Sequence, residues 1–318
     1  MQTFFWKTLA VVLAVANAAE WGYHGDNGPS NWKNEFAVCG GQKQSPINFD
    51  TNTMHYDETL TPLTLTNYAQ LDANKTYKVI NNGHTVTVML DNMDFRLNGA
   101  GFANDYKAAQ LHFHWGTDNE RGSEHTLNGN KYSMEVHIVH YNTAMDNVSY
   151  AIDKDKGLAV LGFFFQVGDA DNTAYNPILD SLSGTVLNAT GISQAEGSVP
   201  SFSLESIIPS ISSLDDYFRY SGSLTTPTCD ESVIWTVFES TIPISNTQMN
   251  KFRQIISHTG ERILDNFRPV QNLNARTVTT SDSNYPTTTT TTEQPSGSAS
   301  SLALSLVALC ATVFQFVL

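Results

Sequence analysis

The sequence predicts a single domain of the mostly β (α+β) class. Short apolar or alternating segments recur along the chain, and turn-forming pairs such as Asn82-Gly83 and Asn128-Gly129 separate them. Helical patterns are few. No linker-like break, internal repeat or low-complexity run interrupts residues 21–271. We therefore expect one sheet-based domain that a few short helices cover.

Six segments carry the strand signal, because they are rich in β-branched and aromatic residues and are bounded by turn residues. In chain order they are residues 76–80, 85–90, 110–115, 134–141, 158–167 and 233–238. Two segments have a helical pattern instead. Asn176 is expected to cap the first helix ahead of Pro177, and residues 246–257 form the second. The inward faces of these helices hold Ile178, Leu179 and Leu182, and Met249, Phe252, Ile255 and Ile256.

The predicted functional site is based on residues 109–116, Ala-Gln-Leu-His-Phe-His-Trp-Gly. Polar and apolar side chains alternate here, which is typical of a strand with two chemically different faces. One face then holds Gln110, His112 and His114, and the other holds Leu111, Phe113 and Trp115. Two imidazoles on one strand face can reach the same metal ion.

A second strand-like segment, residues 134–139, places Glu135 and His137 on one face in the same manner. Three histidines from two strands, without a fourth protein ligand, match an open catalytic zinc site rather than a closed structural one. The residues alone leave open the alternative that these are ordinary strand histidines.

Composition excludes several partners. The 318 residues include 17 Lys and Arg against 31 Asp and Glu, for a formal charge of −14. Nucleic acid and anionic membrane surfaces require a basic footprint, so the sequence predicts no nucleic-acid partner.

Residues 1–19 are predicted to be a secretory signal peptide. Lys7 precedes the apolar residues 8–16, and Ala-Asn-Ala at 16–18 fits the small-residue cleavage pattern. The mature chain is expected to begin near Ala19 or Glu20.

The C-terminal residues predict a lipid anchor. Residues 302–318 are apolar and uncharged, and they follow a Thr/Ser-rich stretch at 276–301 that ends in small residues. This order is typical of a glycosylphosphatidylinositol (GPI) signal, whose apolar tail is removed. A retained single-pass anchor is the alternative, although 302–318 is short for a spanning helix and no basic residue follows it.

Cysteines and sequons agree with secretion. Cys310 lies in the removable tail, which leaves Cys39 and Cys229 as an even pair in an oxidising compartment. Three Asn-X-Ser/Thr sequons are expected glycosylation sites there: Asn74, Asn147 and Asn188.

Nine short segments occur in an order that resembles the α-class carbonic anhydrases, in particular their extracellular GPI-anchored members. They are Trp21-Gly-Tyr-His-Gly25, Gln44-Ser-Pro-Ile-Asn48, Asn81-Asn-Gly-His84, Gln110-Leu-His-Phe-His-Trp-Gly116, Gly122-Ser-Glu-His-Thr126, Glu135-Val-His137, Leu158-Ala-Val-Leu-Gly162, Gly222-Ser-Leu-Thr-Thr-Pro227 and Asn266-Phe-Arg-Pro269. The resemblance covers about residues 20–272. It implies a large, twisted, mainly antiparallel central sheet and a conical active-site cleft, within a domain at residues 20–275.

The resemblance also implies a chemistry. His112, His114 and His137 match the ligands of a catalytic Zn²⁺, and a zinc-bound hydroxide attacks carbon dioxide to form bicarbonate and a proton. Sulfonamides or anions are expected to inhibit at the zinc.

Further residues match the family's site. Gln110, Glu135, His125 and Asn266 match outer hydrogen-bond partners of the ligands. Glu124 and Thr225 match a gate that orients the hydroxide, and His84 matches the proton shuttle. Val139, Val160, Leu224, Thr226 and Trp235 match the carbon dioxide site, and Cys39 and Cys229 match the family's disulfide. Thr87 departs from the pattern, because many active members carry Asn there.

The resemblance and the two terminal signals together place the expected enzyme on the outer face of the plasma membrane. The rival hypothesis is a catalytically silent cell-surface binding module of the same fold. Such relatives typically lose zinc histidines, whereas all three are present in this sequence.

Overall fold

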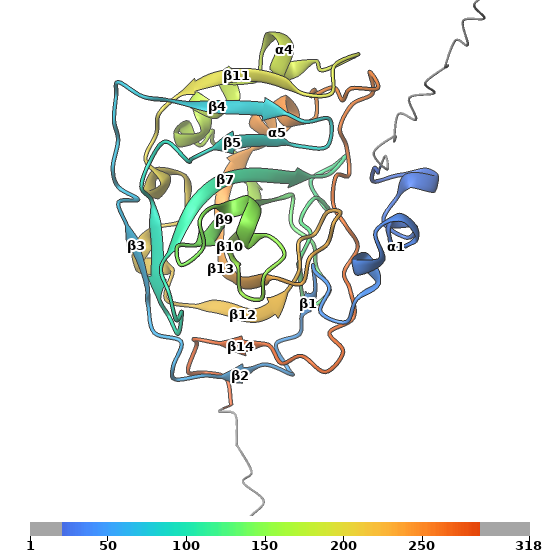
Figure 1. Cartoon of the computed structure of the whole chain (residues 1–318). Coiled ribbons are helices and arrows are strands. Elements are labelled where there is room, and N and C mark those ends of the chain that lie inside the picture. Colours follow the sequence, from blue (N-terminus) through green and yellow to red (C-terminus); the bar gives the residue numbers. More distant parts are fainter. Residues whose placement is uncertain (1–20, 287–318) are drawn as a thin grey trace, which may run out of the picture. The chain divides into compact units, whose positions relative to one another are not determined.

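A computed structural model describes residues 21–286 of the chain. Its central feature is a 12-stranded sheet in the order β11-β4-β5-β7-β9-β10-β13-β12-β14-β2, with β6 also paired to β7 and β3 paired to β6. Figure 1 shows these strands stacked from β11 to β2. Strands β1 and β8 form a separate two-stranded sheet.

The strands have the following bounds: β1 (Asn48–Phe49), β2 (His55–Tyr56), β3 (Leu63–Thr66), β4 (Thr76–Asn81), β5 (Val86–Met89), β6 (Arg96–Gly99), β7 (Tyr106–Trp115), β8 (Thr126–Leu127), β9 (Met134–Asn142), β10 (Leu158–Gly168), β11 (Ala195–Pro200), β12 (Tyr217–Gly222), β13 (Val233–Ser245) and β14 (Thr279–Thr280). All six predicted strand segments are present. The prediction of a mostly β, mainly antiparallel sheet is confirmed. Within residues 21–286, its parallel pairs are β10 with β13 and β14 with β2.

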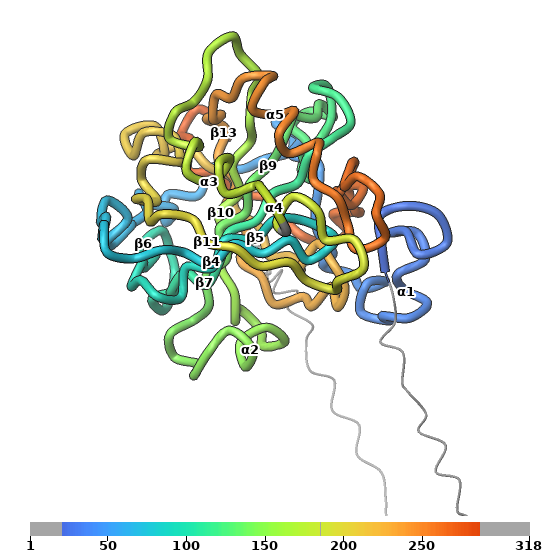
Figure 2. The backbone as a smooth tube through the Cα atoms, turned by 90° about the horizontal axis from the view of Figure 1, so that it is seen from above, coloured from blue at the N-terminus to red at the C-terminus, as the bar shows by residue number. Residues whose placement is uncertain are grey.

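The helices are short: α1 (Trp32–Glu35), α2 (Val148–Ala151), α3 (Asn176–Ser181), α4 (Gly184–Leu187) and α5 (Asn246–Phe252). Turns of 3₁₀ helix are η1 (Gly25–Asn27), η2 (Ala37–Gly40), η3 (Thr173–Tyr175), η4 (Leu204–Ile207) and η5 (Ile211–Ser213). Both views place α1 and its flanking segment at one side of the sheet (Figures 1 and 2). Over residues 21–286, no helix has the length and apolar character that crossing a membrane requires.

Both helix predictions need correction at their ends. Asn176 is the first residue of α3 rather than its cap, because the preceding turn η3 runs directly into the helix. Helix α5 begins as predicted, with a capping box formed by Ser245 and Gln248, but it ends at Phe252. Ile255 is still fully buried, so helical spacing correctly identified an inward residue that lies beyond the helix.

The sheet also extends past residue 275, which was the predicted C-terminal boundary of the domain. Strand β14 pairs with β12 and β2, and Val278 and Thr280 are buried. The prediction of a stalk that begins at residue 276 is therefore wrong for the first residues of that segment. An apolar side chain and strand pairing hold these residues to the domain. The predicted signal peptide and the C-terminal anchor signal lie outside the described residues.

The two faces of the sheet pack into different clusters. The larger cluster contains Leu111, Phe113 and Trp115 of β7, together with apolar residues of the neighbouring strands. The smaller contains Val139, Val160 and other residues of the opposite face. Alternation along β7 and β9 therefore separates a mainly apolar face from the face that carries the three converging histidines.

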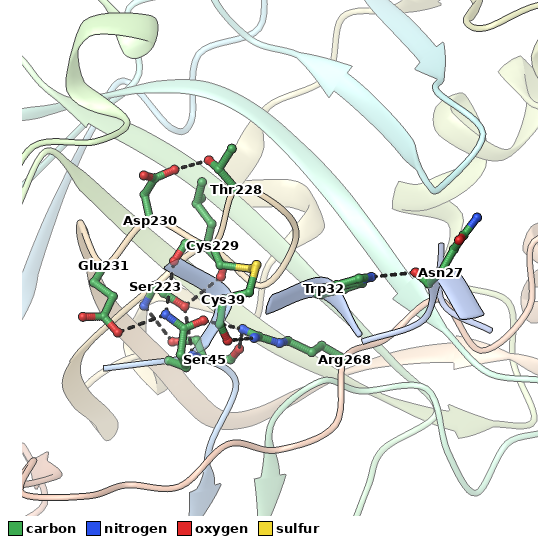
Figure 3. Close-up of a disulfide and its surroundings, with 12 residues drawn as sticks. Asn27, Trp32, Cys39, Ser45, Ser223, Thr228, Cys229, Asp230, Glu231 and Arg268 are labelled. Atoms are coloured by element: carbon green, nitrogen blue, oxygen red, sulfur yellow. Dashed lines mark hydrogen bonds between the residues drawn. A yellow bond between two sulfur atoms is a disulfide. The ribbon is translucent and has the colours of Figure 1, made fainter. Parts of the chain in front are cut away.

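A disulfide joins Cys39 to Cys229 across 190 residues of sequence. Figure 3 shows the buried Arg268 beside it. The Arg268 guanidinium donates to the backbone carbonyls of Cys39 and Ser45 and to the side chain of Gln44. The disulfide and this cation together fasten the N-terminal segment to the domain.

His140 is a fully buried polar residue outside the histidine face. Its Nε2 lies 2.5 Å from the Tyr68 hydroxyl, and its Nδ1 lies 3.2 Å from the Ala159 carbonyl. A neutral ring fits both contacts, with Nδ1 donating and Nε2 accepting. Burial lowers the pKa of His140 to about 4, although hydrogen bonding to backbone carbonyls opposes it.

The disulfide predicts a large loss of stability when it is removed. Replacing both cysteines (Cys39→Ser with Cys229→Ser) should lower the free energy of unfolding by up to about 5 kcal/mol, because the bridge closes a long loop in the unfolded chain. Urea unfolding measures the change, with reduced wild-type protein as the control. Equal stability of the oxidised and double-variant proteins would contradict this expectation.

His140 predicts an acid-sensitive stability. Its pKa is lower in the folded state, so the unfolded chain binds the additional proton as the pH falls. The stabilisation is complete above about pH 6.5 and is lost between pH 6.5 and 4, by about 3 kcal/mol in total. Urea unfolding across this range should give a flatter pH dependence for His140→Gln than for wild type. Parallel curves would show that His140 does not contribute.

Candidate metal centre

Three histidine side chains converge from the two central strands. His112 of β7 stands directly opposite His137 of β9 in the antiparallel register, and His114 follows two positions later on the same face. Their ring centroids are 4.6–5.2 Å apart. One nitrogen of each ring lies within 4.8 Å of one nitrogen of each of the others, a spacing that suits joint coordination of one metal ion.

The second nitrogen of each ring makes a hydrogen bond. His112 Nδ1 lies 3.0 Å from Gln110 Oε1, and His137 Nε2 lies 2.7 Å from Glu135 Oε1. His114 Nδ1 lies 2.8 Å from the backbone carbonyl of Asn266. Each acceptor requires a proton on the nitrogen that it contacts, so the lone pairs of His112 Nε2, His114 Nε2 and His137 Nδ1 remain for a metal.

The surroundings of His114 Nε2 indicate whether a metal ion fits between the three rings. This nitrogen is buried and has no hydrogen-bond partner among the described residues. A buried nitrogen without a partner is costly, and a metal ion between the three rings would satisfy it. The alternative set of His125, Glu135 and His137 also has metal-ligand spacing. Its atoms are already engaged, because Glu135 Oε1 accepts from both His125 and His137.

Electrostatics keep the three rings neutral at pH 7. Burial lowers the pKa of His112, His114 and His137, to about 4 for His114. Burial would raise the pKa of Glu135, but electrostatic interactions and hydrogen bonds with His125 and His137 hold it well below the usual value. The group is therefore three neutral imidazoles beside one carboxylate, and neutral imidazole is the metal-binding form.

Glu124 lies buried next to this group. Its Oε1 accepts from the backbone N–H of Arg268 at 2.8 Å, and its Oε2 is 3.4 Å from His114 Nε2. Burial raises the pKa of Glu124, whereas the electrostatic interaction with His137 and hydrogen bonds from the Arg268 backbone and the Thr225 side chain oppose that shift. The predicted pair of Glu124 and Thr225 is thus brought together beside the histidines. Arg268, for which the sequence alone indicates no role, positions Glu124 through its backbone N–H.

The predicted carbon dioxide residues form a row on the histidine face. Val139 stands opposite Val160, and Val160 stands opposite Trp235, across β9, β10 and β13. The Trp235 ring lies 4.7 Å from that of His137, centroid to centroid. Leu224 is partly buried against the same cluster, and Thr226 follows Thr225 in the adjoining loop.

His84 lies on the turn between β4 and β5, apart from the three converging rings. It is partly exposed and stacks on Trp21 with a centroid distance of 3.8 Å and an interplanar angle of 9°. The His258 ring lies 5.9 Å from it in an edge-on arrangement. The sequence alone does not predict this contact, because no local pattern connects residue 84 with residue 258.

The asparagine side chains of the three sequons differ in their hydrogen bonds. All three asparagines are exposed. Asn147 accepts from the backbone N–H of Tyr150 and so caps α2, and Asn188 accepts from the hydroxyl of Thr190 in its own sequon.

Comparison with known proteins identifies the family. Residues 27–282 match the family model described as eukaryotic-type carbonic anhydrase. The chain is 37% identical to carbonic anhydrase 12 of Homo sapiens over 276 residues, which cover 84% of this chain and 75% of that protein. It is 36% identical to carbonic anhydrase 15 of Mus musculus over 293 residues (87% and 89%), and 38% identical to carbonic anhydrase 1 of Mus musculus over 268 residues (82% and 98%).

These matches cover most of the chain, and the structure is a β-sheet domain with three converging histidines. Both findings agree with the family resemblance seen in the sequence. The chain belongs to the eukaryotic-type, α-class carbonic anhydrase family, and its enzyme class is that of a carbonic anhydrase.

Proposed function

We propose that His112, His114 and His137 hold one Zn²⁺ ion and that the protein catalyses the reversible hydration of carbon dioxide to bicarbonate and a proton. The observation that carries the proposal is the arrangement of three ring nitrogens within 4.8 Å of one another, one of which is buried and has no hydrogen-bond partner within residues 21–286. Membership of the carbonic anhydrase family supports the reaction.

When bound, zinc supplies a nucleophile at neutral pH by lowering the pKa of water to about 7, the known value for carbonic anhydrases. The protein's part is to hold three neutral ligands and leave one position open. Gln110, Glu135 and the Asn266 carbonyl fix the ring orientations through the hydrogen bonds described above. His125 supports Glu135 through a contact of 2.7 Å to Oε1.

Glu124 and Thr225 orient the attacking group. The Glu124 carboxylate accepts the proton of the Thr225 hydroxyl, so the hydroxyl oxygen itself acts as an acceptor toward the nucleophile. Carbon dioxide lies against the row of Val139, Val160 and Trp235, with Leu224 and Thr226 beside it. An apolar wall suits an apolar substrate and excludes competing water.

His84 carries the proton away. If recombination is diffusion-limited at about 10¹⁰ M⁻¹s⁻¹ and the donor has a pKa of about 7, release to bare water is limited to on the order of 10³ s⁻¹. The known turnover of carbonic anhydrase is about 10⁶ s⁻¹. A histidine that relays protons to buffer closes this gap.

The proposal also includes the cellular location of the protein. Residues 1–19 direct the chain to the secretory pathway, and a C-terminal lipid anchor retains the domain at the outer face of the plasma membrane. The disulfide suits an oxidising compartment. Glycosylation at Asn74, Asn147 and Asn188 is compatible with their exposure. Sulfonamides and simple anions are expected to inhibit by binding at the zinc.

Loss of one ligand predicts loss of metal and activity together. His114→Ala should reduce bound zinc from one ion per chain to less than about a tenth and should lower carbon dioxide hydration about 10³-fold or more, because the nucleophile is lost. Metal analysis and stopped-flow hydration with a sulfonamide titration measure both. His55→Gln, which changes a histidine outside the site, is the matched control. A zinc-loaded but inactive wild-type protein would favour the silent binding module.

Loss of the shuttle predicts a different kinetic signature. His84→Ala should lower kcat at least roughly tenfold in dilute buffer and leave kcat/KM nearly unchanged, because proton release follows the chemical step. Added imidazole should restore kcat. An unchanged kcat in dilute buffer would remove His84 from the mechanism.

A further inference from the structure

A cavity of about 300 Å³ lies beside His84, and its lining is rich in protonatable groups. Three histidines line it: His24, His84 and His258. Glu261 and Arg262 contribute the charged side chains of the same lining. The proposed function uses only His84 of this group.

His258 is packed directly against the turn that carries His84. The two rings lie 5.9 Å apart between centroids, at an interplanar angle of 67°. This is a separation that a single water can bridge. His258 Nδ1 also lies close to Gly83: a Cβ atom at position 83 would be only 2.2 Å from this nitrogen. Glycine at position 83 therefore allows His258 to approach the turn.

The other side of His84 is occupied by Trp21, on which the imidazole stacks. Trp21 belongs to an aromatic group with Tyr23 and Trp32. Stacking limits the positions that the His84 ring adopts, and it keeps the ring at the edge of the cavity where His258 stands. Both histidines are partly exposed, so each is within reach of solvent.

We infer that His258 is a second proton-relay residue, which takes the proton from His84 and delivers it to buffer at the protein surface. This inference rests on the proposed shuttle role of His84. It adds a step that the sequence did not suggest, because 258 lies in a loop remote from the histidine strands.

The step involves only proton transfer. Protonated His84 loses an N–H proton to the neutral ring of His258, directly or through one water, and His84 returns to its neutral form. His258 then gives a proton to a buffer base such as imidazole or phosphate and is neutral again. Donor and acceptor are both imidazole rings, so the step needs no other reactant. Glu261 and Arg262, which line the same cavity, are exposed, so solvent and ions screen their charges.

His24 provides the matched control. It lines the same cavity, but it is exposed and its Nε2 lies 3.0 Å from the Leu264 carbonyl. Among the ring contacts found in residues 21–286, His84 pairs with Trp21 and His258. His24→Gln therefore removes an imidazole from the cavity without removing the neighbour of His84.

The test compares His258→Gln, His258→Asn and His24→Gln with wild type as zinc-loaded full-length proteins. In dilute buffer, both His258 variants should lower kcat roughly three- to tenfold, less than the loss of a primary acid–base group, and leave kcat/KM unchanged. Imidazole should restore kcat. His24→Gln should match wild type. Unchanged zinc content and thermal melting show that the variants are folded.

A double variant separates relay from packing. If His258 acts through His84, then His258→Gln should have no further effect on kcat in a His84→Ala background. Full additivity, equal losses of kcat and kcat/KM, or an unchanged kcat in both His258 variants would overturn the relay. If His84→Ala itself leaves kcat unchanged, the shuttle in the proposed function fails. A normal His84→Ala defect with silent His258 variants overturns the relay alone.

Discussion

The antiparallel register between β7 and β9 is the constraint on which the site depends. It sets His112 opposite His137 and His114 opposite Glu135. Because side chains alternate between the two faces of a strand, a shift of one residue would turn these polar groups into the apolar cluster around Phe113. Burial of the apolar face therefore orients the imidazoles before any ligand is present.

Hydrogen bonds from three different sources complete that orientation. His112 uses a side chain of its own strand, His137 uses a carboxylate of its own strand, and His114 uses the backbone of Asn266. Each bond selects one tautomer and directs the other nitrogen inward. The centre is thus preorganised by groups that do not themselves contact a metal, which reduces the reorganisation that binding requires.

Local pattern could predict much of this arrangement. Alternation in residues 110–115 and 134–141 identified both strands and their faces, and motif order identified the family. What it missed depends on contacts between distant segments. The edge-on approach of His258 to His84 and the role of Arg268 in positioning Glu124 arise from loops that meet only in the fold. The cap assigned to Asn176 failed because the turn η3 precedes the helix, which residue type alone does not reveal.

The segment around Asn266 and Arg268 has a consequence for biosynthesis. It supplies the carbonyl that orients His114 and the N–H that holds Glu124, and its guanidinium fastens the region of Cys39. A ribosome makes this segment after every strand of the central sheet except β14. A nascent chain that ends before this segment contains β7 and β9 but lacks these supports. The groups that orient His114 and hold Glu124 are therefore complete only once nearly the whole domain has been synthesised.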